Sequence, residues 1–182
     1  MTVMSLEDTR AARPEADEYA PYYGTYIGKV GDGDIVRALA GQIGETLALL
    51  ESIPESKAGH RYAEGKWSIR EVIGHLCDAE RIFGYRALRF ARGDATPLPG
   101  FDEKSFVANA RFDERSLTSM ADELDAVRRA SIVLFDGLFP EEWLRRGTSN
   151  GQTMSVRAFA WIAAGHERHH LDILRTRYLR FD

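Results

Sequence analysis

Four stretches of this 182-residue sequence carry apolar residues three and four positions apart. This spacing lines up apolar side chains along one face of an α-helix, whereas a half-buried strand needs alternation at every second residue. No stretch sustains such alternation. The sequence therefore predicts four long amphipathic helices. They are expected at residues 34–53, from Ser68 to before Gly93, at residues 116–138, and from Thr153 or Ser155 to Leu179.

Amphipathic helices bury their apolar faces most simply against one another, which favours an all-α four-helix bundle. Capping residues support two of the predicted starts. Asp34 is a candidate N-cap. Ser68 and Glu71 match a capping box, in which each side chain accepts a hydrogen bond from the other residue's backbone N–H. The third helix is expected to bury Leu117, Met120, Leu124, Val127, Ile132 and Phe135.

Composition narrows the class of protein. A chain of 182 residues is expected to form one domain, and its 44% hydrophobic and 29% charged residues are ordinary for a soluble globular protein. The net charge of −4 argues against a nucleic-acid-binding surface. No apolar run is long enough to cross a bilayer and no secretory signal is recognisable, so we expect a cytoplasmic protein that binds no membrane. The single cysteine, Cys77, excludes an internal disulfide.

The chain divides into two parts by polarity. Residues 1–18 are polar and charged, and we expect them to form a flexible N-terminal arm. Residues 19–182 are expected to form the bundle domain. The tyrosine-rich stretch YAPYYGTYI, which follows the arm, is expected to pack on the outside of this domain.

Histidines interrupt the apolar face of the fourth predicted helix. His166 and His170 lie on that face, one helical turn apart. A buried imidazole needs a partner, because burying it unsatisfied is unfavourable. His75 borders the apolar face of the second helix, and a facing helix could bring it to the pair. Three neutral histidines with an open coordination position are typical of a catalytic metal site rather than a structural one.

Other interpretations of these residues stay open. Two histidines four residues apart are a weak signal alone, and a core histidine is more often structural. His169 could replace one ligand or hydrogen-bond to it. Asp78 could accept a hydrogen bond from His75, as carboxylates do beside metal-binding histidines, or it could pair with Arg81 or Arg70.

The remaining polar residues receive no catalytic role from their spacing. Cys77 points nearly opposite to His75 and is interpreted as a packing residue. His60 lies in a predicted loop and is expected at the surface. Glu80 and Glu167 lie on other faces of their helices. Five further side chains could line a pocket, although core-edge and surface roles are favoured for each: Trp67, Arg89, Arg92, Trp143 and Arg157.

Several separated motifs resemble the DinB/YfiT-like superfamily. They are KWSIREVIGHLCDAE, then RALRFARGD with TPLPGF, then SVRAFAWIAAGHERHHLDIL, in the family's order from about Tyr19 onward. The resemblance implies a four-helix bundle with an unusual order of helix directions. It also implies a divalent metal ion, usually zinc or nickel, whose ligand positions fall on His75, His166 and His170. Homodimers are common in the family, so a homodimer is expected here.

The resemblance favours a metal-dependent enzyme that acts on a small molecule. Relatives include transferases that join a low-molecular-weight thiol, such as bacillithiol, to an electrophile, and thiol-dependent maleylpyruvate isomerases. The leading hypothesis is therefore a thiol (S-)transferase with a low-molecular-weight thiol as cosubstrate, since a metal ion can deprotonate a bound thiol. The alternatives are a metal-dependent hydrolase, in which the metal activates water, and a non-catalytic metal-binding stress-response protein. No general acid or base is identified by the sequence.

Overall fold

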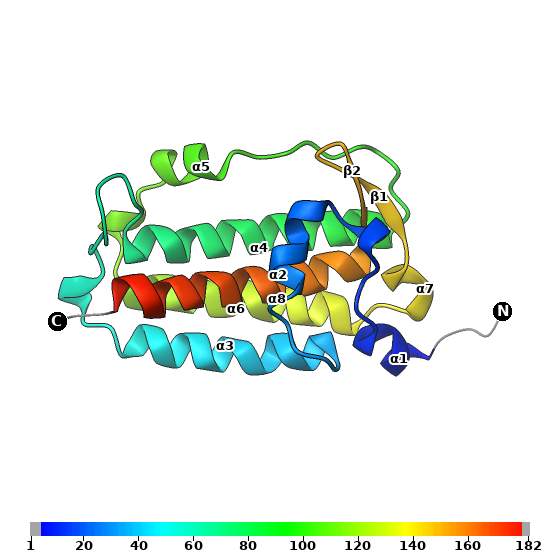
Figure 1. Ribbon diagram of the computed structural model, residues 1–182, viewed down its shortest axis with the longest axis horizontal. Coiled ribbons are helices and arrows are strands. Elements are labelled where there is room, and N and C mark those ends of the chain that lie inside the picture. Colours follow the sequence, from blue (N-terminus) through cyan, green and yellow to red (C-terminus); the bar gives the residue numbers. More distant parts are fainter. Residues whose placement is uncertain (1–4, 180–182) are drawn as a thin grey trace.

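The computed structural model describes residues 5–179 and contains a bundle of four long helices (Figure 1). These helices are α3 (Ile35–Glu51), α4 (Ile69–Ala91), α6 (Leu117–Asp136) and α8 (Val156–Ile173). Each helix starts directly after an N-cap residue whose side chain accepts hydrogen bonds from backbone N–H groups of the first turn. These residues are Asp34, Ser68, Ser116 and Ser155. The predicted all-α four-helix bundle is confirmed, and two of the helix starts follow the predicted capping residues Asp34 and Ser68.

The long helices do not follow one another around the bundle. α4 packs mainly against α8 and α6, and α3 packs mainly against α6 and α8, so α3 and α4 lie on a diagonal. The neighbours α4 and α6 run in the same direction (Figure 1). Parallel neighbours need a long connection, and residues 92–116 supply it by returning along the whole bundle. This connection carries α5 (Glu103–Asn109) and the short helix η4 (Phe112–Glu114).

Short elements surround the bundle. They are α1 (Leu6–Ala11), η1 (Ala16–Glu18), η2 (Pro21–Tyr23), α2 (Gly24–Ile27), η3 (Glu55–Lys57), α7 (Pro140–Trp143), β1 (Arg146–Ser149), β2 (Gln152–Ser155) and η5 (Leu174–Tyr178). β1 and β2 form an antiparallel hairpin that the sequence analysis does not predict. Strands of four residues are too short to show alternation, but Asn150 and Gly151 both have positive φ, as the two-residue turn of a hairpin requires.

The described residues before the tyrosine-rich stretch pack on the bundle, which differs from the expected loose arm. α1 contacts α3 and α7. Arg13 donates two 2.8 Å hydrogen bonds to backbone carbonyls at and after the end of α2. Glu18 is buried and accepts hydrogen bonds from Arg157 of α8. The charges of this segment thus serve local contacts, which polarity alone does not reveal; residues 1–4 lie outside the described residues.

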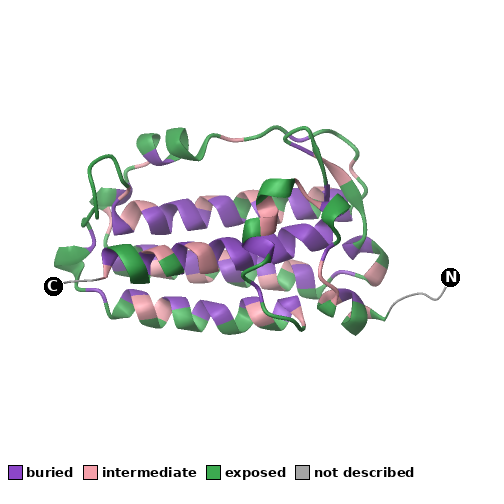
Figure 2. Ribbon diagram, in the orientation of Figure 1, coloured by how far each residue is buried: buried purple, intermediate pink, exposed green. Residues whose placement is uncertain are grey.

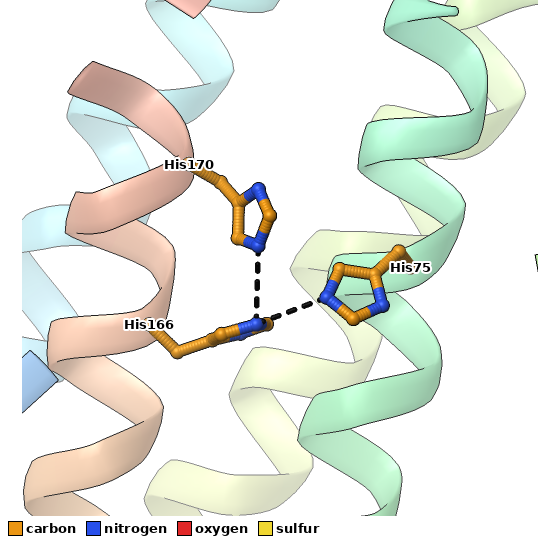
Figure 3. A group of neighbouring side chains, drawn as sticks. All are labelled: His75, His166 and His170. Carbon is orange, nitrogen blue, oxygen red and sulfur yellow. Dashed lines mark hydrogen bonds between the residues drawn. The ribbon is translucent and has the colours of Figure 1, made fainter. Parts of the chain in front are cut away.

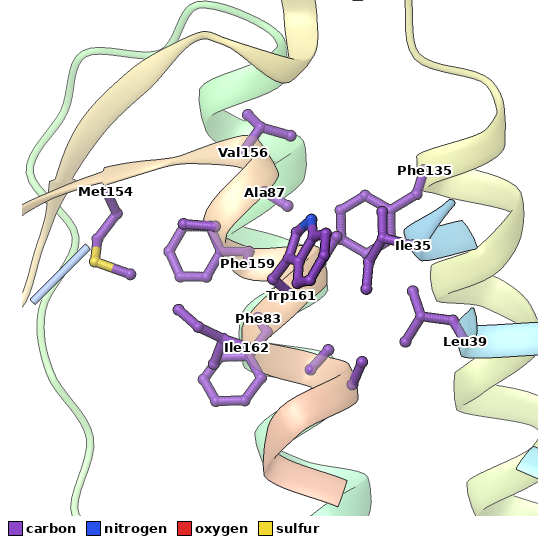
Figure 4. Close-up of a cluster of buried hydrophobic side chains, with 14 of the residues drawn as sticks. Ile35, Leu39, Phe83, Ala87, Phe135, Met154, Val156, Phe159, Trp161 and Ile162 are labelled. Carbon is purple, nitrogen blue, oxygen red and sulfur yellow. The ribbon is translucent and has the colours of Figure 1, made fainter. Parts of the chain in front are cut away.

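The inner faces of the long helices are buried (Figure 2) and form two apolar clusters. One cluster lies at the hairpin end and includes Phe83, Phe159 and Trp161 (Figure 4). The other lies at the η5 end and includes Ile73 and Met120. Two clusters built from several helices hold the bundle together largely by burial of apolar surface.

A buried ionic network joins three helices inside the bundle. Arg128 of α6 is 0% exposed and donates hydrogen bonds of 2.6 and 2.7 Å to Glu80 of α4. It also pairs with Glu167 of α8 at 2.7 Å. Arg128 therefore occupies a position on the inner face of α6, whereas Val127 and Ile132, which were predicted to be core residues, are only half-buried. Hydrophobic patterning cannot detect a buried arginine that is paired with two carboxylates.

Candidate metal centre

Three histidines from two antiparallel neighbouring helices meet inside the bundle (Figure 3). His75 projects from α4, and His166 and His170 project from successive turns of α8. The Nε2 atom of His166 lies 3.0 Å from Nε2 of His75 and 3.2 Å from Nε2 of His170. One ligand atom from each ring lies within 4.8 Å of the others. The structure thus brings together the three histidines that the sequence indicates as metal ligands.

The spacing of these nitrogens fits a shared cation. Two nitrogens bound to one tetrahedral ion at about 2.0–2.1 Å are about 3.3 Å apart. The separations of 3.0 and 3.2 Å agree with that value. A neutral ring nitrogen either donates or accepts one hydrogen bond. The Nε2 atom of His166 has two close nitrogen neighbours and therefore cannot satisfy the hydrogen-bonding needs of all three rings. A metal ion would accept a lone pair from each of the three.

Burial keeps these histidines neutral. All three are at most 9% exposed. Desolvation lowers the pKa of His75 to about 4 and that of His170 to about 3, and repulsion from neighbouring histidines lowers the pKa of His170 further. The pKa of His166 is also well below its ordinary value, for the same two reasons. Because neutral imidazole is the form that binds metal, the cluster is ready to bind at neutral pH without releasing protons from these rings.

The metal-free protein is expected to lose stability as the pH falls below about 6.5, the ordinary pKa of histidine. Below that pH the unfolded chain binds protons on His75, His166 and His170, whereas the folded cluster resists protonation until the pH nears about 4 for His75 and about 3 for His170. The unfolded state then binds more protons, so the free energy of unfolding falls by up to about 1.4 kcal/mol per pH unit for each histidine.

Urea denaturation of the metal-free protein at a series of pH values from about 7.5 to about 4.5 measures this slope. A His75→Leu variant is the matched control, because it removes one buried histidine and should reduce the slope. Equal slopes for the two proteins would contradict the burial of His75 as a neutral ring.

A cavity of about 360 Å³ adjoins the three histidines. Much of its wall is aromatic and comes from four separate parts of the chain: Tyr22, Tyr23, Tyr26, Trp67, Phe83 and Phe101. Its polar lining includes Arg86 of α4, Glu103 of α5, Asn150 of the hairpin turn and His169 of α8. The cavity therefore offers a small molecule an apolar enclosure with a few polar groups beside the histidine cluster.

The tyrosine-rich stretch covers one side of the cluster, in keeping with its expected position outside the bundle. The ring of Tyr26 lies 5.2 Å from the ring of His166 and 5.2 Å from that of His169, measured between centroids. The hydroxyl groups of Tyr22 and Tyr26 are 2.6 Å apart. A Cβ atom at Gly165 would collide with the backbone carbonyl of Tyr26. Glycine at this position thus allows α2 to lie directly on α8 beside His166.

The structure also places the residues whose roles were left open. Asp78 pairs with Arg81 at 3.8 Å and makes no hydrogen bond to His75 within residues 5–179. His169 lines the cavity but is not one of the three clustered rings. His60 is exposed, as expected.

Most of the other polar and aromatic residues discussed in the sequence lie outside the site. Cys77 is fully buried, and burial raises the pKa of its thiol to about 12, which fits a packing residue. Glu80 and Glu167 both form ion pairs with Arg128, which gives them a structural role. Among the arginines and tryptophans near loops, Trp67 lines the cavity. The others pack in the core or form ion pairs: Trp143, Arg89, Arg92 and Arg157.

Sequence reasoning misses two charged residues of the cavity. Arg86 follows His75 by eleven positions, which is close to three turns, so both lie on one line along α4. A charged residue on that inward line is a signal that periodicity could have revealed. Glu103 lies on the long connection between α4 and α6, and only the tertiary path of that connection brings it to the cavity.

Comparisons with known proteins agree with the observed fold. A family model described as the DinB superfamily matches residues 38–174. A protein of Oceanobacillus iheyensis, named as a suspected metal-dependent hydrolase, is 27% identical over 140 residues, which are 75% of this chain and 77% of that protein. YfiT from Bacillus subtilis is described as a probable metal-dependent hydrolase with an unusual four-helix bundle topology. Its structure matches with a TM-score of 0.65 and 14% identity, over 92% of this chain and 97% of YfiT.

None of the helices within residues 5–179 is both long enough and apolar enough to cross a membrane.

Proposed function

Because the chain belongs to the DinB superfamily, whose model matches residues 38–174, we propose that it is a metal-dependent hydrolase of a small molecule. The convergence of three neutral histidines beside a cavity carries the proposal. His75, His166 and His170 would be the metal ligands. Within residues 5–179 no carboxylate, thiolate or fourth histidine joins this group, which leaves a coordination position open, as in catalytic sites.

A divalent ion held in this way supplies a Lewis acid and makes water a stronger nucleophile at neutral pH. The chain supplies the remaining chemistry. Glu103 lines the cavity and takes part in no ion pair within residues 5–179, so its carboxylate is available to accept a proton from a water molecule. The hydroxyl groups of Tyr22 and Tyr26 hydrogen-bond to each other, and the one that accepts in this pair keeps its own hydrogen free to donate to a substrate oxygen that gains charge.

Two observations support hydrolysis ahead of thiol transfer. Glu103 lines the cavity and would serve as the general base that water activation needs. The names of both related proteins also point to metal-dependent hydrolysis. The chain's own thiol, Cys77, is buried and outside the cavity, so thiol transfer would require a thiol cosubstrate.

Thiol transfer remains the second candidate, because one feature favours it. A second cavity, of about 480 Å³, shares Trp67 and His170 with the first. Two openings that meet at the histidine cluster would allow two molecules to approach it from different sides. A low-molecular-weight thiol and an electrophile are such a pair.

The proposal is tested with zinc-, nickel- and cobalt-loaded protein, small esters and amides as substrates, and cysteine as a probe thiol. We expect hydrolysis that needs no thiol and that a chelator abolishes. Glu103→Gln should lower kcat by about 100-fold or more without changing the metal content, since general base catalysis contributes about that much. Glu64→Gln, on an exposed loop outside the cavity, is the control and should leave kcat unchanged.

Two other results would contradict hydrolysis. Turnover of an electrophile only in the presence of thiol, with a thiolate-to-cobalt charge-transfer band, would place thiol transfer first, because sulfur would then bind the metal directly. Bound metal with neither turnover nor a thiol response would favour a non-catalytic metal-binding protein.

A further inference from the structure

Arg86 is a buried cation without a carboxylate partner. The residue is 4% exposed and lines the cavity beside the three histidines. One guanidinium nitrogen donates a 2.7 Å hydrogen bond to the backbone carbonyl of Pro99, and the side chain also hydrogen-bonds with the Tyr23 hydroxyl. The guanidinium carbon lies 5.7 Å from the centre of the Phe101 ring. No Asp or Glu within residues 5–179 forms an ion pair with it.

The other buried arginines show what is unusual here. Arg128 binds both carboxylate oxygens of Glu80, and Arg157 binds both carboxylate oxygens of Glu18. A buried guanidinium is normally paired in this way, because its charge is otherwise costly to remove from water. Arg86 is removed from water without a carboxylate to balance its charge, and this burial lowers its pKa. The two neutral acceptors around it use only part of its five N–H donors.

The position of Arg86 points to a ligand rather than to the scaffold. Its Cα lies about 16 Å from that of His75 along α4, and arginine side chains on a helix lean toward the N-terminus, which here is toward His75. Glu103 lines the same cavity but is not within ion-pair distance of Arg86 in this structure. A molecule in the cavity can therefore meet the guanidinium at one end and the histidine cluster at the other.

We infer that Arg86 binds a carboxylate of the substrate, while the bond that is hydrolysed lies at the histidine cluster. A planar guanidinium matches a carboxylate with two parallel hydrogen bonds, and a single guanidinium balances a single negative charge. The aromatic wall encloses the apolar body between these two ends. The substrate class is thus a small carboxylic acid with an aliphatic or aromatic body and a separate hydrolysable group. The hydrolysable group in this description rests on the proposed hydrolase function, whereas the carboxylate rests on Arg86.

The test compares 4-phenylbutyrate with 4-phenylbutanamide as ligands of the metal-loaded protein, with binding followed by calorimetry. The two probes have the same apolar body and differ in charge. We expect the acid to bind about 10- to 100-fold more tightly than the amide, as a charged hydrogen-bonded pair would produce. Arg86→Gln should remove that preference at unchanged metal content, and Arg86→Lys should retain part of it. Arg89→Gln, which alters a half-buried arginine of the same helix that pairs with Asp94 outside the cavity, should leave the preference for the acid intact.

The outcomes are distinguishable. Equal affinity of the wild-type protein for acid and amide would overturn the inference, whatever the variants do. A preference for the acid that survives in Arg86→Gln would also overturn it, since the carboxylate would then bind the metal. A drop in the melting temperature of Arg86→Gln with an unchanged preference would show that Arg86 only holds Pro99. The binding measurement needs no turnover, so it tests the role of Arg86 even if the protein is not a hydrolase. Conversely, hydrolysis of neutral esters would support the hydrolase proposal even if Arg86 did not bind a carboxylate.

Discussion

Replacing His166 or His170 with alanine is expected to abolish tight metal binding while the bundle stays folded. Each change removes one of the three converging nitrogens. Removing a residue that only orients a ligand lowers metal affinity by about 10- to 100-fold, and the loss of a ligand itself should be larger. The two apolar clusters that hold the helices together are formed by other side chains, so the helices should remain packed.

Elemental analysis and circular dichroism measure these two effects. His169→Ala is the matched control, because its ring lines the cavity without joining the cluster, and it should retain the metal. Stoichiometric metal in either ligand variant would refute the assignment of that histidine. Global unfolding of both ligand variants would instead indicate that the metal has a structural role.

Arg128→Ala is expected to destabilise the protein by about 3–5 kcal/mol, the range for breaking a buried ion pair from one side. The change would leave Glu80 and Glu167 buried without their counter-charge. Part of this loss should be recovered when both glutamates are replaced with glutamine, since neutral amides need no counter-charge.

Urea denaturation at neutral pH measures the effect of Arg128→Ala. The neighbouring Arg129 provides a close control, because its side chain is 69% exposed and pairs with Asp125 at the surface. Arg129→Ala should change the free energy of unfolding by no more than about 1 kcal/mol. Equal effects of the two substitutions would show that the buried network contributes little.

Most of the fold follows from local sequence signals. The capping residues Asp34 and Ser68 mark helix starts that the structure confirms, because their side chains bind backbone groups a few positions away. Helix directions, in contrast, depend on the route of the connection at residues 92–116, which no local pattern encodes. The unusual order of directions was therefore expected from the family resemblance alone.

The candidate site was predictable in part, for a similar reason. His166 and His170 stand out because they replace apolar residues on a helix face, and the position of His75 on a facing helix completes the set. Glu103 is invisible to periodicity because it lies on a connection outside the four long helices. Arg86 lies on a helix, but its lack of a carboxylate partner only becomes evident when its three-dimensional surroundings are known.

The position of α8 in the chain has a consequence for folding order. α8 is the last of the four long helices, yet it packs against α2, α3 and α4 and carries two of the three clustered histidines. Contacts between residues 24–27 and residues 156–173 close a loop that spans most of the chain. Such distant contacts form late, because closing a long loop costs entropy that only the finished packing offsets. During synthesis, a nascent chain that has not yet released α8 from the ribosome therefore lacks the histidine cluster. We expect that a metal ion held by this cluster would bind only after the bundle is complete.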